Sequence, residues 1–520
     1  MGAMRMPFFA KPGGQNSVLD YYLSFELSLL GWSLNKAPFP NPGAAPGGTG
    51  IYINRGLGPD SNFPKPSLIS WPLGSQPDNP TLAALNNKVK VYANNFSIAT
   101  AMYYAQNDNS WSDCWSKMVN YYNPLTFNDL VLAPAFNSQQ ITAKLKDLSK
   151  FDGNLGGFGM SPKEADLLYT IGVGDGSWGA FYSIAALWFM RCTLFGFSTN
   201  LQTIESLKFR PEDIQIDTGE TKMPYPLFEG IQSLVEYLYY VKAPGAVMPL
   251  NQAAPLFLKR RIEKISKIPS GINLTDTNQQ RYDFDFVILT STQWSVQTSI
   301  QFEGFSLDEL PQNKLTTQNT QHNISSCKVF FPLKEKYWTL KGNLIPQVII
   351  TDTFIQDIYG LNWTSKAADK GVVLASYTWE DDSLKLLPFS DDNTLAEKVL
   401  TELSRITMST VGQDIRNHID SSKPVTIQWI QKPDYVGCAK LYRSENESGN
   451  MLDLSYNQNY AAKSKLYFAG ENYGVEGGWT EPALRSAMDC VLQMLNNIGA
   501  TFLAPGFNFK TDYPKWPKTK

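Results

Sequence analysis

Residues 465–494 read KLYFAGENYGVEGGWTEPALRSAMDCVLQM and say the most about the fold. Residues 465–469 are a short apolar and aromatic run that the following glycine ends, so they predict a strand. Apolar residues recur at helical spacing after Pro482, which suits a first-turn position with Thr480 or Glu481 as the cap. Because a helix that begins after a glycine-rich loop directs backbone N–H groups outward, this strand–loop–helix predicts an anion site.

The residues FAGE at 468–471 and Gly478-Trp479 make this stretch specific. Together they resemble the C-terminal flavin-binding motif of the flavin-dependent amine oxidase family. A strand–loop–helix of an unrelated α/β protein is the competing interpretation. The resemblance implies an FAD cofactor, with Glu471 near the ribityl or pyrophosphate region. The cofactor-binding residues that it implies here are Gly470, Glu471, Gly478, Trp479 and Thr480.

The composition argues against several classes of protein. The chain has 520 residues, 43% of them hydrophobic, enough for one large core or two moderate ones. Its 45 basic and 48 acidic residues give a net charge of −3, so nothing indicates nucleic-acid binding or a charged membrane surface. Two histidines and five scattered cysteines without a CxxC pattern argue against a zinc site, a disulfide scaffold and a Ser-His-Asp triad. The apolar run 180–197 contains Arg191 and predicts a buried helix rather than a membrane span.

The order of helical and strand-like segments predicts a mixed α/β (α+β) protein. Residues 11–110 predict a loop-rich region with short helices, 111–240 a largely helical one, and 395–420 an amphipathic helix. Strands are predicted at 328–332, 348–350 and 372–377, and in a hairpin-like segment within 255–300. Residues 440–462, which include RSENESGNMLDLSYNQNY, predict a surface loop.

In the resembled family, an FAD lobe is assembled from discontinuous segments, and a substrate lobe with a mixed sheet and helices fills the gaps. The expected FAD-lobe segments are 1–10, 241–300 and 441–505; the substrate lobe takes 11–240 and the sheet region 301–440, and 506–520 is a tail. The resemblance also implies that the backbone of Ile262 lies against the adenine, although an ordinary strand residue explains this position equally well.

The first residues, Gly2-Ala3-Met4-Arg5, resemble a segment of the L-amino acid oxidase and tryptophan 2-monooxygenase branch. In that branch the arginine pairs with the substrate carboxylate and the residues before it line the flavin. Gly2, Ala3, Met4 and Arg5 are therefore expected at the cofactor, and Arg5 also at the substrate. A planar guanidinium can bind a carboxylate through two hydrogen bonds, which supports this role.

Two strand residues complete the expected site. The resemblance implies that Lys328, in SSCKVF, holds a water near flavin N5, where burial would lower the pKa of its amine. A strand lysine that extends to solvent is the alternative. Tyr377, in VVLASYTW, would donate its hydroxyl to the substrate carboxylate beside Arg5, although core packing also explains it. Trp479 would form the opposite wall, so Lys328 is expected to be catalytic and Arg5, Tyr377 and Trp479 to bind substrate.

A dinucleotide-binding protein needs a strand–GxGxxG–helix fingerprint. In the resembled family it precedes the Gly-Ala-Met-Arg segment, whereas this sequence has its GxGxxG match at 174–179, GDGSWG. Asp175 would place a negative charge beside a pyrophosphate, and Trp178 would crowd the turn. We therefore expect the first βαβ unit elsewhere: in a longer gene, in a processed precursor, or in a separate N-terminal chain of a split enzyme.

The predicted function is FAD-dependent oxidation of an L-amino acid, with hydride transfer from Cα to flavin N5 and reoxidation by O2. The products are an oxo acid, ammonia and H2O2, or an amide after oxidative decarboxylation. A polyamine or monoamine oxidase is an alternative against which Arg5 argues, and an inactive fragment or one subunit of a split flavoenzyme is another. We expect a homo-oligomer that acts on a small molecule, without nucleic acid or membrane, and we favour a cytoplasmic location while leaving export open.

Overall fold

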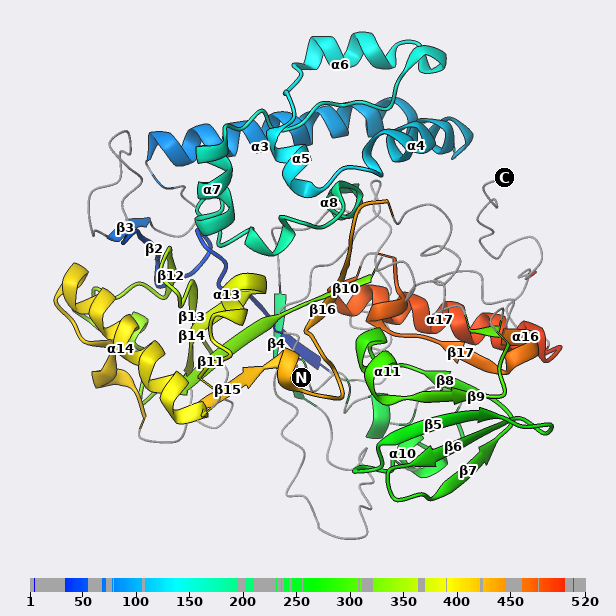
Figure 1. Cartoon of the computed structure of the whole chain (residues 1–520). Coiled ribbons are helices and arrows are strands. Elements are labelled where there is room, and N and C mark those ends of the chain that lie inside the picture. The colour runs from blue at the N-terminus through cyan, green and yellow to red at the C-terminus, as the bar shows by residue number, and fades with distance from the viewer. Residues whose placement is uncertain are drawn as a thin grey trace.

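Two lobes make up the structure, a computed structural model (Figure 1). The residues that it describes are Met4, 33–54, 68–71, 77, 79–104, 108–194, 202–208, 231, 235, 238–240, 242, 246–254, 256–306, 309–310, 321–362, 370–389, 391–420, 424–445, 461–475, 477–500 and 508. In the first lobe a seven-stranded sheet lies between two layers of helices. The second lobe combines the segments 256–306 and 461–500.

The sheet of the first lobe has the strand order β15-β11-β14-β13-β12-β2-β3. Neighbouring strands run antiparallel, except that β12 and β2 are parallel. The strands are β15 (Val425–Gln428), β11 (Ser326–Pro332), β14 (Val372–Trp379), β13 (Asp357–Leu361), β12 (Val348–Thr351), β2 (Thr49–Tyr52) and β3 (Leu68–Trp71). The central strands are buried almost throughout, which explains why they read as continuous apolar runs.

One face of this sheet packs against a layer of helices. The helices are α3 (Pro80–Ala99), α4 (Asp108–Tyr122), α5 (Phe127–Leu132), α6 (Ser138–Leu145), α7 (Pro162–Ile171) and α8 (Ala186–Leu194). Local sequence sets their starts: Ser161 and Glu164 form a capping box at α7, and Pro162 occupies its first turn. Apolar side chains of the layer join Leu374 and Tyr377 of β14 in one core.

The opposite face of the sheet packs against α14 (Asp392–Val411). Asp391 caps this helix, and Gly412, with a left-handed φ of 68°, ends it. The short helix α13 (Glu380–Leu384) continues directly from β14. Val329 and Val373 point to the α14 side, whereas Leu374 and Tyr377 point to the helical layer. Leu374 and Tyr377 share a face because the pairing of β11 with β14 shifts its register between Val329 and Phe330.

The second lobe contains two small sheets. The first sheet has the strand order β7-β6-β5-β9, in which β7–β6 and β6–β5 are antiparallel and β5–β9 is parallel. The second sheet is the parallel pair of β8 and β17. The strands are β5 (Ile262–Lys267), β6 (Ile272–Asp276), β7 (Arg281–Phe284), β9 (Gln301–Glu303), β8 (Val287–Leu289) and β17 (Leu466–Phe468). The helices are α10 (Leu250–Ala253), α11 (Gln293–Ser299), α16 (Ala461–Ser464) and α17 (Thr480–Asn497). Residues from both sheets share one core.

A two-stranded ribbon of β10 (Gln321–Ile324) and β16 (Ala439–Tyr442) lies beside both lobes (Figure 1). A second ribbon pairs β1 (Ser33–Pro38) with β4 (Gln202–Lys208). The lobes also meet at the loop after β15, where the hydroxyl of Ser295 on α11 donates to the carbonyl of Pro433 at 3.0 Å. Arg261 and Asp434 form an ion pair there at 3.3 Å.

The structure confirms the mixed α/β class and the strands expected at 328–332, 348–350 and 372–377. Two expectations are wrong. The region 11–110, expected to be loop-rich with short helices, contains the 20-residue helix α3, and residues 440–442, at the start of the expected surface loop, belong to the buried strand β16. The region 111–240 contains the helices α4 to α8, in line with the prediction, and also the strand β4. Strand pairing outweighs local composition at β4 and β16. None of the described helices combines the length and the hydropathy that crossing a bilayer requires.

Candidate functional site

The loop between β17 and α17 is the centre of the candidate site. It begins at Gly470, whose φ of 121° only glycine adopts readily, and continues as a 3-10 turn, Glu471–Tyr473. The hydroxyl of Ser486 on α17 accepts from Gly470 N at 2.8 Å and donates to the Gly470 carbonyl at 2.9 Å. The Tyr473 hydroxyl donates to the carbonyl of Ser291, just after β8, at 3.0 Å. The loop is therefore fixed at the carboxyl ends of two parallel strands, where open α/β sheets bind ligands.

Glu471 holds this loop to the ribbon. Its Oε1 accepts from the backbone N–H of Lys440 at 2.8 Å and from that of Gly478, and its Oε2 accepts from the Asn472 amide at 2.7 Å. Burial raises the pKa of the Glu471 carboxyl, and the hydrogen bond from Gly478 and the charge of Lys440 oppose that rise. Both carboxylate oxygens of Glu471 thus accept hydrogen bonds from groups of the protein itself. A contact between Glu471 and the ribityl chain of a flavin stays a prediction.

The start of α17 differs from the expected one. Thr480 and Glu481 are inside the helix, and Trp479 takes the cap position, where its side chain makes no capping hydrogen bond. A tryptophan cannot accept a hydrogen bond from the first turn as threonine or glutamate would, so expecting Thr480 or Glu481 as the cap was wrong. First-turn N–H groups without a side-chain cap can bind an anion or a carbonyl oxygen of a ligand.

Lys328 and Tyr377 face one another on neighbouring strands. They are directly opposite in the β11–β14 register, and the lysine Nζ lies 4.9 Å from the centre of the tyrosine ring. Both side chains are almost fully buried, at 3% and 5% exposure. The ring of Trp379, which sequence reasoning did not select, lies 4.7 Å from that of Tyr377. The structure therefore brings an amine and two aromatic rings together on the sheet face that packs against the helical layer.

Cys438 connects this sheet face with the loop. Burial raises the pKa of its thiol to about 11, the charge of Lys328 opposes the rise, and the charge of Glu471 adds to it. Such electrostatic effects require proximity, so Lys328 and Glu471 both lie near one half-buried thiol. The expected catalytic residue and the expected cofactor motif, far apart in sequence, thus lie in one region of the molecule.

Two buried amides near the loop fit a polar ligand. Asn323 on β10 pairs with Lys440 on β16, and within the described part of the chain neither atom of its side-chain amide has a hydrogen-bond partner. The same holds for Gln293 at the start of α11, whose backbone N–H donates to Asn472 at 3.1 Å. Buried amides without partners are costly, by about 1–3 kcal/mol each, so a bound group with donors and acceptors along its edge suits both.

The other predicted residues are dispersed. Gly2, Ala3 and Arg5 lie outside the described residues, whereas Met4 is buried in the same core as Tyr377. Ile262 begins β5 and packs, half-buried, on the core of the second lobe. Its contact with an adenine, and the position of Trp479 opposite Tyr377, stay predictions.

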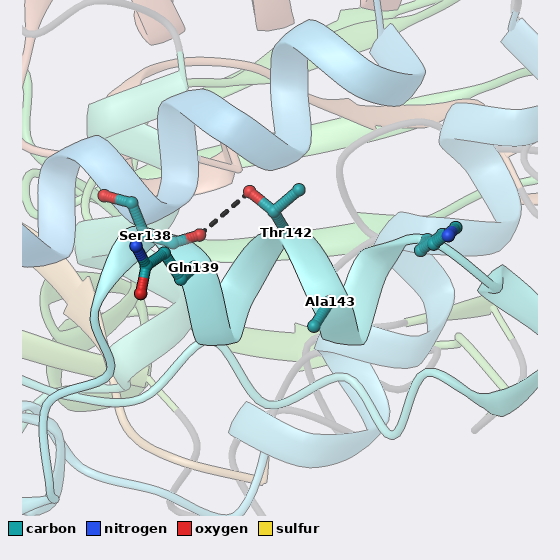
Figure 2. Close-up of a pocket in the computed structure, with 5 residues that line it drawn as sticks. Ser138, Gln139, Thr142 and Ala143 are labelled. Atoms are coloured by element: carbon teal, nitrogen blue, oxygen red, sulfur yellow. Dashed lines mark hydrogen bonds between the residues drawn. The ribbon is translucent and has the colours of Figure 1, made fainter.

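The GxGxxG match is a turn and no phosphate loop. It follows α7 rather than a strand, and the Asp175 carboxylate accepts from Val173 N and from the Trp178 indole, both at 3.0 Å. The side chain of Asp175 thus occupies the backbone donors that a phosphate would need. On the described surface, the hollow in Figure 2 is lined by residues of α6, and its Thr142 hydroxyl donates back to the Ser138 carbonyl at 2.8 Å. It contains no convergent polar groups and lies in the helical layer, away from β11 (Figure 1).

Sequence reasoning missed Lys440, Cys438, Asn323 and Trp379. Lys440 is fully buried, and its ammonium donates to the Gly474 carbonyl inside the loop. A sequence rarely signals a buried lysine, because lysine usually reaches solvent. One available signal was the apolar spacing of 439–442, just before the polar stretch that was taken for a loop.

Comparison with known proteins gives one consistent result. The profile of the family described as flavin containing amine oxidoreductase matches residues 138–495, well over half of the chain. The chain is 30% identical to a tryptophan 2-monooxygenase of Pantoea agglomerans pv. gypsophilae over 46% of this chain and 43% of that protein. It is 27% identical to an L-amino-acid oxidase of Siganus canaliculatus over 49% of this chain and 45% of that protein. The matched part therefore spans less than half the length of these curated relatives.

Solved structures agree on the fold. A putrescine oxidase double mutant superposes with a TM-score of 0.53 at 11% identity, over 96% of this chain and 91% of that one. A cyclohexylamine oxidase from Brevibacterium oxydans gives a TM-score of 0.54 at 12% identity, over 95% and 90%. At such identities the likeness concerns the architecture alone.

Proposed function

The chain belongs to the flavin-containing amine oxidoreductase family, and from this premise we propose that it oxidises an L-amino acid with an FAD held at the loop after β17. The observation that carries the proposal is the buried Lys328–Tyr377 pair, in which the lysine Nζ lies 4.9 Å from the centre of the tyrosine ring. The charges of Lys328 and Glu471 both affect the pKa of the nearby Cys438 thiol. An amine and a phenol within a dry aromatic wall suit a substrate with a carboxylate and an amino group.

We assign the following roles to the residues of the sheet face. The Tyr377 hydroxyl donates to the substrate carboxylate, and Arg5, placed here from its sequence context, binds the same carboxylate through two hydrogen bonds. Lys328 holds a water at the reacting carbon, and the tyrosine ring stabilises its charge. Trp379 and Trp479 exclude bulk water, which strengthens each of these electrostatic contacts.

The residues of the loop fit a flavin. The N–H groups in the first turn of α17 suit a ring carbonyl or a phosphate oxygen, and the amides of Asn323 and Gln293 suit the alternating donors and acceptors of the ring edge. When bound, the flavin supplies the two-electron acceptor for the hydride of the substrate Cα and returns the electrons to O2. The products are an oxo acid with ammonia and H2O2, or an amide if decarboxylation intervenes.

A further part of this proposal concerns the dinucleotide half of the cofactor. Among the described strands, β8 and β17 form a parallel sheet of only two strands. Parallel sheets usually have more than two strands and are covered on both faces. Further strands could therefore pair with the edges of β8 and β17. We propose that a βαβ unit with the GxGxxG fingerprint docks there, from the same gene product or from a separate chain.

Purified protein tests the proposal. We expect the preparation to be yellow, either alone or after co-expression with the upstream coding segment, and to form peroxide with one or more L-amino acids. Arg5→Ala should raise the KM about tenfold or more, because a bidentate carboxylate contact is lost. A folded protein that binds no FAD in either preparation would overturn the proposal, and an unchanged KM in Arg5→Ala would refute the carboxylate role.

A further inference from the structure

One histidine joins three elements beside the candidate site. His322 on β10 places its Nε2 at 2.9 Å from Oε1 of Glu380, and its Nδ1 at 3.2 Å from Nη2 of Arg443. A guanidinium can only donate hydrogen bonds, so Nδ1 must be the acceptor. The imidazole is then neutral with its proton on Nε2, which donates to the Glu380 carboxylate.

The same ring also touches the second lobe, and its partner Arg443 contacts the helical layer. The ring of Trp294 on α11 lies edge-on to it, with the ring centres 5.7 Å apart. Arg443 extends further, with its Nη1 at 3.5 Å from the hydroxyl of Ser183. The His322 side chain is only 13% exposed, so these contacts exclude most of the solvent around it.

Glu380 is the residue through which His322 can affect the sheet face. It follows Trp379, whose ring packs at 4.7 Å on that of Tyr377, and it has a left-handed φ of 47°, which is unfavourable for a glutamate. Its backbone N–H donates to the Ser325 carbonyl at 2.9 Å. Strained backbone persists only where its surroundings hold it, and the His322 hydrogen bond is part of that support.

We propose that His322 is a positioning residue: in its neutral form it fixes Glu380, and through it Tyr377 at the end of β14, against Arg443 and the second lobe. The catalytic consequence rests on the proposed amino acid oxidation, whereas the protonation state and the geometry of His322 do not. The Arg443–His322–Glu380 chain therefore makes the position of Tyr377 depend on a single proton.

Protonation of His322 changes this arrangement in a defined way. Nδ1 then becomes a donor and the ring a cation, so Arg443 is repelled while the contact with Glu380 becomes an ion pair. Helix α11 carries no charged residue that could compensate. Asp382 of α13 is hydrogen-bonded to Gln356 and Lys385, Asp381 of α13 is exposed, and Lys440 lies on the other face of the β10–β16 ribbon. Protonation should thus release Arg443, whereas the contact of the ribbon with Glu380 at the end of β14 is kept as an ion pair.

The tautomer can be measured without any enzyme assay. The chain has two histidines, so protein labelled with 15N-histidine gives two ring spin systems, and His418→Gln assigns them. We expect the His322 signals of an Nε2–H imidazole at pH 8. An Nδ1–H tautomer, or an imidazolium at pH 8, would overturn the inference.

Two substitutions separate the two hydrogen bonds. His322→Gln keeps a donor at the Nε2 position, facing Glu380, whereas His322→Asn keeps an acceptor at the Nδ1 position, facing Arg443. If Glu380 is the residue through which His322 acts, the KM for the amino acid should rise about tenfold in His322→Asn and less than about threefold in His322→Gln at pH 8, with kcat little changed in both.

His418→Gln is the matched control. His418 also pairs with a glutamate, its Nδ1 lying 2.8 Å from Oε1 of Glu335, but it lies beside Lys334, near the start of β14 and not near Tyr377. We expect this variant to keep the wild-type KM. Equal KM values in the wild type and both His322 variants would refute the positioning role. If no amino acid is oxidised, the proposed function fails, and the tautomer measurement still decides the geometry of His322.

Discussion

The sheet face around Lys328 and the loop around Glu471 are built in opposite ways. In the sheet, the backbone pairing of neighbouring strands brings an amine and aromatic rings into one space. In the loop, the carboxylate of Glu471 and the ammonium of Lys440 bind backbone groups of the protein itself. The comparison teaches that the most recognisable residues of the sequence hold the shape of the loop, whereas the residues to which we assign the chemistry lie on the less conspicuous strands.

Lys328→Met attacks the sheet side and has the largest expected effect. Methionine fills a similar volume and removes a buried charge, so the melting temperature should change little. The kcat/KM for an L-amino acid should fall roughly 10²–10⁴-fold, the usual loss when a group that handles a proton is removed. Peroxide formation measures the fall.

Lys398→Met is the control for that variant. The Lys398 amine lies 4.7 Å from the Phe389 ring, an equivalent cation–π contact on the exposed side of α14. It should keep wild-type activity. Equal kcat/KM values in the two lysine variants would contradict the division between sheet and loop.

Gly477→Ala attacks the loop side. A Cβ at this position would lie 2.0 Å from the Lys440 carbonyl oxygen, and φ is +52°. We expect the free energy of unfolding to fall by about 3 kcal/mol, from strain and displaced backbone, together with weaker flavin binding. Urea unfolding measures the loss.

Gly412→Ala is the control. Gly412 has a similar φ of +68°, with open space around the new Cβ, so the free energy of unfolding should fall by only about 1 kcal/mol. Similar losses in both glycine variants would show that the loop does not need its close approach to β16.

Asp489→Asn tests the helix that carries the loop. Burial raises the pKa of Asp489 on α17 to about 7. Because the folded pKa exceeds the unfolded one, this group contributes stability below about pH 4 that is lost as the pH rises through 7. Asparagine should therefore raise the free energy of unfolding at pH 8 by roughly 2 kcal/mol, with little change at pH 4. Urea unfolding at both pH values measures this, and a variant less stable than the wild type at pH 8 would contradict it.

Glu471→Gln should have the smallest effect. The amide oxygen still accepts from Lys440 and Gly478, and only the contact with Asn472 must rearrange, at a cost of about 1 kcal/mol in unfolding free energy. Thermal melts and the peroxide assay measure the outcome. We expect kcat to stay within about threefold of the wild type. A loss comparable to that of Lys328→Met would show that this carboxylate acts on the cofactor directly.

The sequence alone predicted the secondary-structure elements better than the tertiary contacts between them. Strands β11, β12 and β14 are apolar enough to be recognised, and the glycines around 470–478 mark a loop. The register that sets Lys328 opposite Tyr377 depends on pairing between distant segments, which no local spacing encodes. The same limit hid Lys440, since burial of this lysine depends on the carbonyl of Gly474 that accepts its hydrogen bond.

The start of α17 illustrates a second limit. Threonine is a preferred helix cap, and the prediction placed the start of the helix at Thr480 or Glu481. In the structure Trp479 occupies the cap position without a side-chain capping bond. Our proposal assigns the first-turn N–H groups to a ligand, and a rule based on local sequence does not include such a role.

The rate of flavin reduction under anaerobic conditions tests the central claim most directly. The flavin absorbance is followed after mixing with an L-amino acid in the wild type, Lys328→Met and Glu471→Gln. The division between sheet and loop predicts that reduction slows at least about 100-fold in Lys328→Met and less than about threefold in Glu471→Gln, with flavin bound in both. Reduction at the wild-type rate in Lys328→Met, or an equal slowing in Glu471→Gln, would contradict it.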